Sequence, residues 1–161
     1  KALAQPSRIR KQLQDILEVE QPATHNLLCK RIAELWGIRV SPRLQAAVDD
    51  ALIGSYIDMT DSDVQAYWRT KEASLDYPYY RTNSNRDVSD IPLIEIMNAV
   101  RYAVEQQVSI PQADLLRSAT RLLGFARKGA SIESQISRAI QKLISNGVLV
   151  ENDGIVTSSE K

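Results

Sequence analysis

A basic and polar stretch toward the end of the chain holds the residues best suited to contact nucleic acid. Between positions 117 and 142, six arginines and lysines are accompanied by a single acidic residue, Glu133. Arginine and lysine bind phosphates and guanine edges, glutamine pairs with adenine, and serine hydroxyls contact the backbone. The candidate contact residues are Arg127, Lys128, Ser134, Gln135, Arg138, Gln141 and Lys142. The alternative is a solvated helix face with ordinary surface charges.

The sequence shows no set of residues that would form a catalytic or metal site. His25, the only histidine, stands near an expected helix start, where a surface or capping role is expected. Asp49 and Asp50 point to different sides of a helix, and neither has a matching base or ligand. A lone histidine lacks the partners that metal binding or proton transfer requires. We therefore predict no catalytic residue, no metal and no cofactor.

Cys29 is the single cysteine. It excludes an internal disulfide and a zinc site built on paired cysteines, and we expect a small buried side chain. A reducing, cytoplasmic setting fits this cysteine usage. No apolar run approaches the roughly 18 residues that span a bilayer, so no membrane partner is expected. The first residue is Lys1 rather than Met, which suggests a piece of a larger protein.

Composition and missing motifs narrow the function classes. Twenty basic residues balance twenty acidic ones, whereas a dedicated nucleic-acid binder usually carries a basic excess, so the total charge argues against tight DNA binding. The phosphate-binding loop of nucleotide hydrolases is missing, as is an acidic pair followed by a Glu-x-Lys nuclease motif. We therefore do not expect this chain to hydrolyse ATP or to act as an enzyme.

The candidate contact residues must be positioned by helices, and residues 7–68 show how such helices are arranged. Apolar residues recur at helical spacing in three stretches, residues 9–17, 28–35 and 44–52. Thr24 and Ser41 are suitable N-caps for the second and third helices, and Gly37 suits the end of the second. Residues 56–59 and 64–68 then form two strands around a polar turn. Three helices followed by a hairpin are the order of a winged helix, a helix-turn-helix variant.

Residues 91–157 repeat this order. A shift of 87 positions pairs Ile9 with Ile96 and Gly37 with Gly124, and a shift of 92 aligns the third helices. The last hairpin turns at Asp153-Gly154, a strong short-turn signal. We predict a mainly α protein with short β-hairpins, built from two tandem winged-helix-like units joined by a linker over residues 69–90. The alternative is that two three-helix units align by chance.

The linker contains Tyr77, Tyr79 and Tyr80. These tyrosines either pack against both units and fix their orientation, or offer Tyr79 and Tyr80 as platforms on which bases of a single strand stack.

Three stretches resemble a C-terminal domain of unknown function found on very large bacterial proteins related to superfamily I DNA helicases. They read RIAELWG (residues 31–37), DIPLIEI (residues 90–96) and LLGFARKG (residues 122–129). In such proteins, the resemblance implies, this domain follows a split helicase core and a restriction-endonuclease-like nuclease domain. The other domains of that parent protein are then expected partners.

The two units differ in charge. The third helix of the first unit carries Asp49 and Asp50, and its hairpin adds three more aspartates, which would repel phosphates. The second hairpin also carries Glu151 and Asp153, so the third helix of the second unit is the expected nucleic-acid face. We predict a non-catalytic accessory module that binds nucleic acid, either DNA or RNA, through that helix. The alternative is a docking module for another protein or another domain, without nucleic-acid contact.

Overall fold

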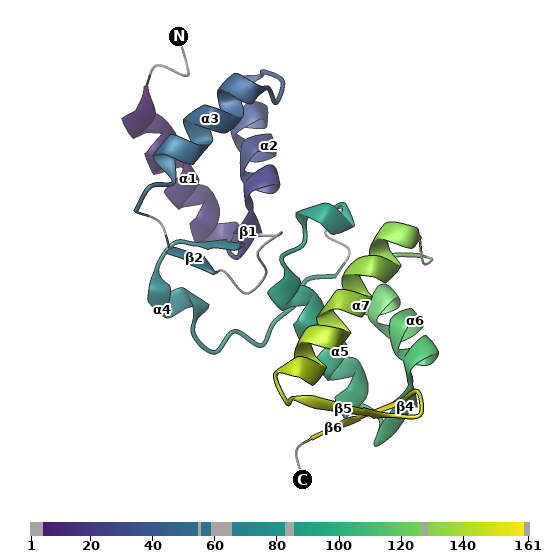
Figure 1. Cartoon of the computed structure of the whole chain (residues 1–161). Coiled ribbons are helices and arrows are strands. Elements are labelled where there is room, and N and C mark those ends of the chain that lie inside the picture. Colours follow the sequence, from purple (N-terminus) through teal and green to yellow (C-terminus); the bar gives the residue numbers. More distant parts are fainter. Residues whose placement is uncertain (1–4, 55, 59–65, 83–85, 127–128, 160–161) are drawn as a thin grey trace. The chain divides into compact units, whose positions relative to one another are not determined.

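The structure is a computed structural model that describes residues 5–54, 56–58, 66–82, 86–126 and 129–159. The chain divides into two compact units, Lys1–Tyr77 and Pro78–Lys161. Each contains three long helices and one three-stranded antiparallel sheet (Figure 1). The boundary falls inside the predicted linker. The predicted class, mainly helical with small antiparallel strand pairs, is confirmed.

The first unit follows the predicted order with one added strand at its start. Its elements are α1 (Pro6–Glu20), β1 (Ala23–Thr24), α2 (His25–Trp36), α3 (Pro42–Ala51), β2 (Tyr56–Asp58), β3 (Ala66–Trp68) and α4 (Lys71–Ser74). The sheet order is β1-β3-β2, so β3 is central and Tyr67 is opposite both Ala23 and Ile57. Strand β1 was not among the predicted elements. The polar turn predicted between the two later strands lies outside the described residues.

The predicted helix boundaries of the first unit rest on side-chain caps. The Leu27 amide donates to Thr24 Oγ1, and the Leu44 amide donates to Ser41 Oγ, both at 3.2 Å. Gly37 ends α2 in the left-handed region at φ 62°, where residues with a Cβ are disfavoured. Both N-caps and the glycine stop are confirmed.

The core of the first unit is apolar and fills the space between its helices. Ile9, Leu13 and Leu17 from α1 are fully buried, as are Leu28, Ile32, Leu44 and Val48. The predicted inward position of Leu35 is wrong, because this side chain is 60% exposed. The buried face of α2 turns toward Ala33, and at the helix end Trp36 packs against the core in place of Leu35.

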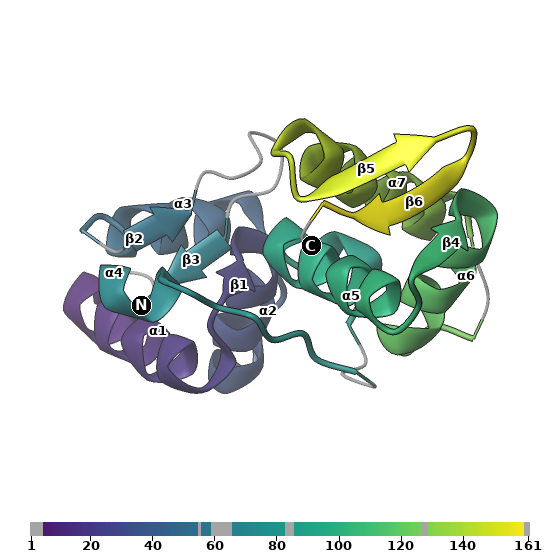
Figure 2. The ribbon, with the colours of Figure 1, turned by 90° about the horizontal axis from the view of Figure 1, so that it is seen from below.

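The second unit has the same order. Its elements are α5 (Leu93–Glu105), β4 (Ser109–Pro111), α6 (Gln112–Leu122), α7 (Ala130–Ser145), β5 (Leu149–Asn152) and β6 (Ile155–Ser158). The sheet order is β4-β6-β5, as Figure 2 shows. Asp153 and Gly154 form the hairpin turn with φ values of 51° and 79°. Positive φ at both central residues is the requirement of the tight two-residue turn that Asp-Gly predicts.

Equivalent core positions of the two units are equivalently buried. Ile96, Val100 and Val104 on α5 are at most 1% exposed, like their counterparts on α1 at a shift of 87. Ile136 and Ile140 on α7 are fully buried, as are Leu44 and Val48 at a shift of 92. The predicted linker is less irregular than expected, since α4 and a 3-10 turn over Val88–Asp90 lie within it. No helix in the described part of the chain has the length and apolar character needed to cross a membrane.

Candidate nucleic-acid interface

Five of the seven predicted contact residues belong to α7, which Figure 1 labels, and their helical spacing places them on one face. Successive residues of an α-helix are about 100° apart, so positions 134, 135, 138, 141 and 142 share one arc. The opposite arc carries Ile136, Ala139, Ile140 and Leu143, all buried in the core. Ser134 and Gln141 are exposed, and Gln135, Arg138 and Lys142 are partly exposed. Arg127 and Lys128 lie outside the described residues.

Two further serines extend this face. Ser131 and Ser145 are exposed and fall on the same arc, at i−3 from Ser134 and i+3 from Lys142. Neither serine was among the predicted contact residues, although their helical spacing was a sufficient signal. We call residues 131, 134, 135, 138, 141, 142 and 145 the α7 face. At about 1.5 Å per residue it is about 21 Å long.

Charge on the α7 face has one sign. Glu133, the only acidic residue of α7, is about 100° away from Ser134 and lies off the arc. Arg138 Nη1 donates to Gln135 Oε1 at 3.3 Å, which holds the two side chains together along the helix surface. Lys142 is in the last turn, where the helix dipole favours a cation, so it also stabilises α7 itself.

The hairpin after α7 does not extend the basic surface. Glu151 Oε2 accepts a hydrogen bond from the Gly154 amide at 2.9 Å, and Asp153 is exposed in the turn. Two carboxylates at the hairpin tip repel phosphates. The hairpin is therefore a poorer candidate for contact with a polyanion than the α7 face.

The equivalent helix of the first unit has the opposite charge. The shift of 92 places Asp49 and Asp50 of α3 at the positions of Gln141 and Lys142. Both aspartates are exposed. The same two positions that would repel phosphates in the first unit thus carry an amide and an ammonium group in the second.

His25 has partners that the sequence analysis did not foresee. Its Nε2 lies 2.6 Å from Asp49 Oδ1, and its ring nitrogens are 3.8 Å from Cys29 Sγ. The prediction that Asp49 lacks a matching base is therefore wrong. Only the i, i+4 spacing of His25 and Cys29 hinted at this cluster, because Asp49 comes from a different helix.

The cluster is nevertheless poorly suited to nucleophilic chemistry. Burial, followed by the nearby charge of Asp49, raises the pKa of the Cys29 thiol to about 11. The thiolate is the reactive form of cysteine, so Cys29 stays protonated and unreactive at neutral pH. Its side chain is fully buried, as predicted. Among the residues that the structure describes, no group of three or more His, Cys, Asp or Glu side chains is placed to hold a metal ion.

A buried ionic cluster in the second unit was missed entirely. Arg86 Nη1 and Nη2 donate to the two carboxylate oxygens of Glu95 at 2.8 and 2.9 Å, and Arg81 Nε donates to Glu95 Oε1 at 3.0 Å. The side chains of Arg86 and Glu95 are 2% and 0% exposed. Burial alone would raise the pKa of Glu95, but the hydrogen bonds from Arg86 and Arg81 outweigh it and hold that pKa below its ordinary value.

The ionic cluster fastens the end of the predicted linker to α5. Asn98 Nδ2 adds a hydrogen bond to the Tyr79 carbonyl at 2.9 Å. The Tyr79 side chain is 67% exposed, whereas Tyr80 is partly buried with its ring 5.9 Å from that of Tyr102. Tyr79 therefore remains the better candidate for base stacking, and Tyr80 has a packing role.

No family model, curated protein or solved structure matches this chain.

Proposed function

We propose that the chain consists of two tandem winged-helix units and binds duplex DNA through the α7 face. The observation that carries the proposal is the composition of that face, which presents arginine, lysine, glutamine and serine without a carboxylate. These side chains bind phosphates and base edges, and the major groove, about 12 Å wide, admits an α-helix.

The order of elements supports the winged-helix part of the proposal. In each unit a short strand between the first two helices pairs with the last strand, and the hairpin follows the third helix. The third helix is the usual recognition element of helix-turn-helix proteins, and in the second unit it is α7.

The proposal extends to the protein in which such a module works. The resemblance of residues 31–37, 90–96 and 122–129 to a domain of helicase-related proteins supports an accessory, non-catalytic role beside helicase and nuclease domains. In that role α7 would position DNA for catalytic domains elsewhere in the parent protein.

Fluorescence anisotropy with labelled duplex, forked and single-stranded DNA tests the proposal. Binding should weaken steeply between about 50 and about 200 mM salt, because phosphate contacts release counterions. The double variant Arg138→Glu/Lys142→Glu should lose at least about tenfold in affinity and show a flatter salt slope. The matched control is Arg101→Glu/Arg117→Glu, which changes the net charge equally but lies on α5 and α6.

Two results would contradict the proposal. The first is that none of the three DNA forms binds at low salt. The other is an equal loss of affinity in both double variants, which would mean that net charge rather than the α7 face determines binding.

A docking role without nucleic-acid contact is the second candidate function, and one observation favours it. Leu35, Ile38 and Val40 of the first unit are 60%, 41% and 38% exposed within six residues of chain. Exposed apolar side chains of this kind occur at protein interaction sites. They lie at the end of α2 and in the following turn. If DNA does not bind, Leu35→Ser should weaken association with a partner domain without unfolding the first unit.

A further inference from the structure

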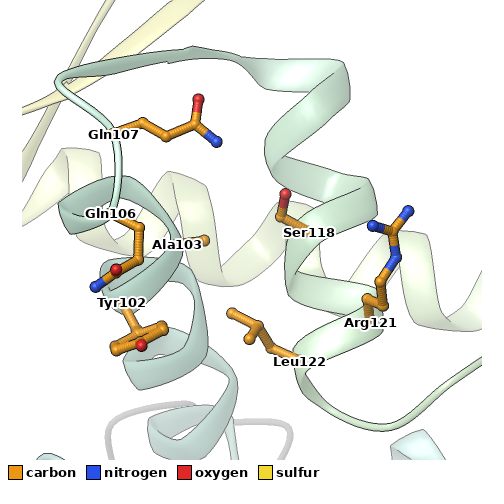
Figure 3. A pocket seen from close by; sticks show the side chains of 7 residues that line it. All are labelled: Tyr102, Ala103, Gln106, Gln107, Ser118, Arg121 and Leu122. Atoms are coloured by element: carbon orange, nitrogen blue, oxygen red, sulfur yellow. The ribbon is translucent and has the colours of Figure 1, made fainter.

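A cavity of about 250 Å³ lies between α5 and α6 (Figure 3). Its lining residues are Tyr102 and Ala103 of α5, Gln106 and Gln107 directly after that helix, and Ser118, Arg121 and Leu122 of α6. Small-molecule sites usually enclose about 300–1,000 Å³. This cavity is therefore better matched to one or two side chains of a larger partner than to a whole ligand.

The lining combines an apolar base with a polar and basic rim. Ala103 is buried, Leu122 is partly buried, and Tyr102 leaves 45% of its surface exposed. Gln106, Gln107 and Ser118 supply hydrogen-bonding groups, and exposed Arg121 supplies the charge. The lining contains no carboxylate. The next arginine on α6, Arg117, pairs with Asp114, whereas no salt bridge joins Arg121 to a described acidic residue.

The first unit shows what occupies the equivalent position there. The shift of 87 pairs Gln107 with Glu20, Ser118 with Arg31, and Arg121 with Glu34. Arg31 Nε lies 2.8 Å from Glu20 Oε2, and its Nη1 lies 2.9 Å from Glu34 Oε1. A guanidinium thus bridges α1 and α2 in the first unit.

The second unit replaces this bridge with an open, oppositely charged cavity. Ser118 is too short to cross between the helices, and Arg121 presents a cation where Glu34 presents a carboxylate. The intramolecular ion pair of the first unit therefore has no counterpart among the residues that line the cavity.

We propose that the α5–α6 cavity binds a segment of a partner protein in which an apolar side chain adjoins an acidic one. The apolar side chain packs on Tyr102 and Leu122, and the carboxylate pairs with Arg121. The amide groups of Gln106 and Gln107 are placed to bond the backbone of the bound segment. This site does not use the α7 face, so it stands whether or not DNA binds there.

Nuclear magnetic resonance of the isotope-labelled full chain tests the proposal. The probe is a short acetylated helical peptide with leucine and glutamate at i, i+4 spacing, and its control has glutamine in place of every glutamate. We expect the acidic peptide to shift the amide signals of Tyr102, Gln106, Ser118 and Leu122 at concentrations up to about 1 mM. The glutamine peptide should bind at least about tenfold more weakly.

Variants of exposed residues separate the cavity from general charge. Arg121→Glu should lower the affinity for the acidic peptide at least about tenfold and should bind a lysine-containing version of the peptide instead. Arg117→Glu is the matched control, since it makes the same charge change on the same helix outside the cavity. It should leave binding unchanged.

Three outcomes would overturn the proposal. They are the lack of shifts at the cavity with the acidic peptide, equal shifts with both peptides, and equal losses in the two variants. Benzoate is included as a small aromatic carboxylate. If benzoate shifts the cavity signals and the acidic peptide does not, the site takes a small molecule and the peptide proposal fails.

Discussion

Replacing Arg86 with methionine is expected to destabilise the second unit strongly while the first unit stays folded. Arg86 donates to both oxygens of Glu95, and both side chains are almost completely buried. Methionine keeps much of the aliphatic stem but removes the charge and both hydrogen bonds. Glu95 would then keep a buried carboxylate with Arg81 as its remaining arginine partner in the cluster.

The size of the effect follows from burial. Removing one partner of a buried ion pair costs about 3–5 kcal/mol, and Arg81 keeps the cost near the lower end because it also bonds Glu95. A domain of this size is stable by roughly 4–13 kcal/mol, so Arg86→Met removes a large share of its free energy of unfolding. Arg81→Met should cost less, about 1–2 kcal/mol, because the Arg81 side chain is 29% exposed and solvent screens it.

Urea denaturation followed by two optical probes measures the effect of Arg86→Met on the stability of each unit. Both tryptophans, Trp36 and Trp68, belong to the first unit, so tryptophan fluorescence reports on that unit alone. Far-ultraviolet circular dichroism reports on the helices of both units. For Arg86→Met the circular dichroism transition should begin at lower urea, and the fluorescence midpoint should stay where it is in the unaltered chain.

The comparison of the two arginines tests the role of the buried ion pair. A change in the free energy of unfolding of less than about 0.5 kcal/mol for Arg86→Met, the range of ordinary surface substitutions, would contradict that role. A larger loss for Arg81→Met than for Arg86→Met would also contradict it, because burial would then not determine the cost.

Three further predictions concern Glu95, Cys29 and the boundary of the second unit. The pKa of Glu95 is lower in the folded chain than in the unfolded chain, so ionised Glu95 stabilises the fold fully above the ordinary glutamate pKa, and this stabilisation is lost as the pH falls through the depressed pKa. Acid titration followed by circular dichroism should show that Glu95→Gln loses less stability in acid than the unaltered chain. An equal loss of stability in the two proteins would contradict this prediction. Burial raises the pKa of Cys29 from an ordinary value of 9.0 to about 11, so the folded chain should hold about a hundredfold less thiolate at pH 8 than an ordinary cysteine. Cys29 should therefore react with iodoacetamide only after the chain is unfolded in urea. Rapid labelling of the folded chain would contradict its burial. A fragment of residues 91–161 lacks Arg81 and Arg86 and should not fold, whereas residues 78–161 should; equal circular dichroism spectra for the two fragments would refute the role of the cluster.

The helices could be predicted because their signals are local. Apolar spacing within one helix, the caps at Thr24 and Ser41, and the Asp153-Gly154 turn all act over a few residues of sequence. The strand β1 could not be predicted in this way. Its two residues show no alternation, and they become a strand only by pairing with Ala66 and Tyr67, more than forty positions away.

The same distinction holds for the candidate site. The residues of α7 could be placed on one face from their spacing alone, since a regular helix fixes their directions. The pairing of Arg81 and Arg86 with Glu95 could not, because both arginines lie in a segment without periodic signal. His25 and Asp49 come from separate helices and meet only when those helices pack.

At equivalent positions of the two units, buried residues are similar in type and exposed residues differ. This contrast bears on function. Ile9 and Ile96, 87 positions apart, are both fully buried, so core packing alone accounts for their similarity. Core packing does not explain why the position of exposed Asp50 on α3 is taken by Lys142 on α7. It also does not explain why the position of the bridging Arg31 is taken by Ser118 in the second unit. Both differences turn an acidic or internally neutralised surface into one that attracts anions. The α7 face and the α5–α6 cavity use different residues of the second unit, so the two proposed sites can be tested by separate substitutions.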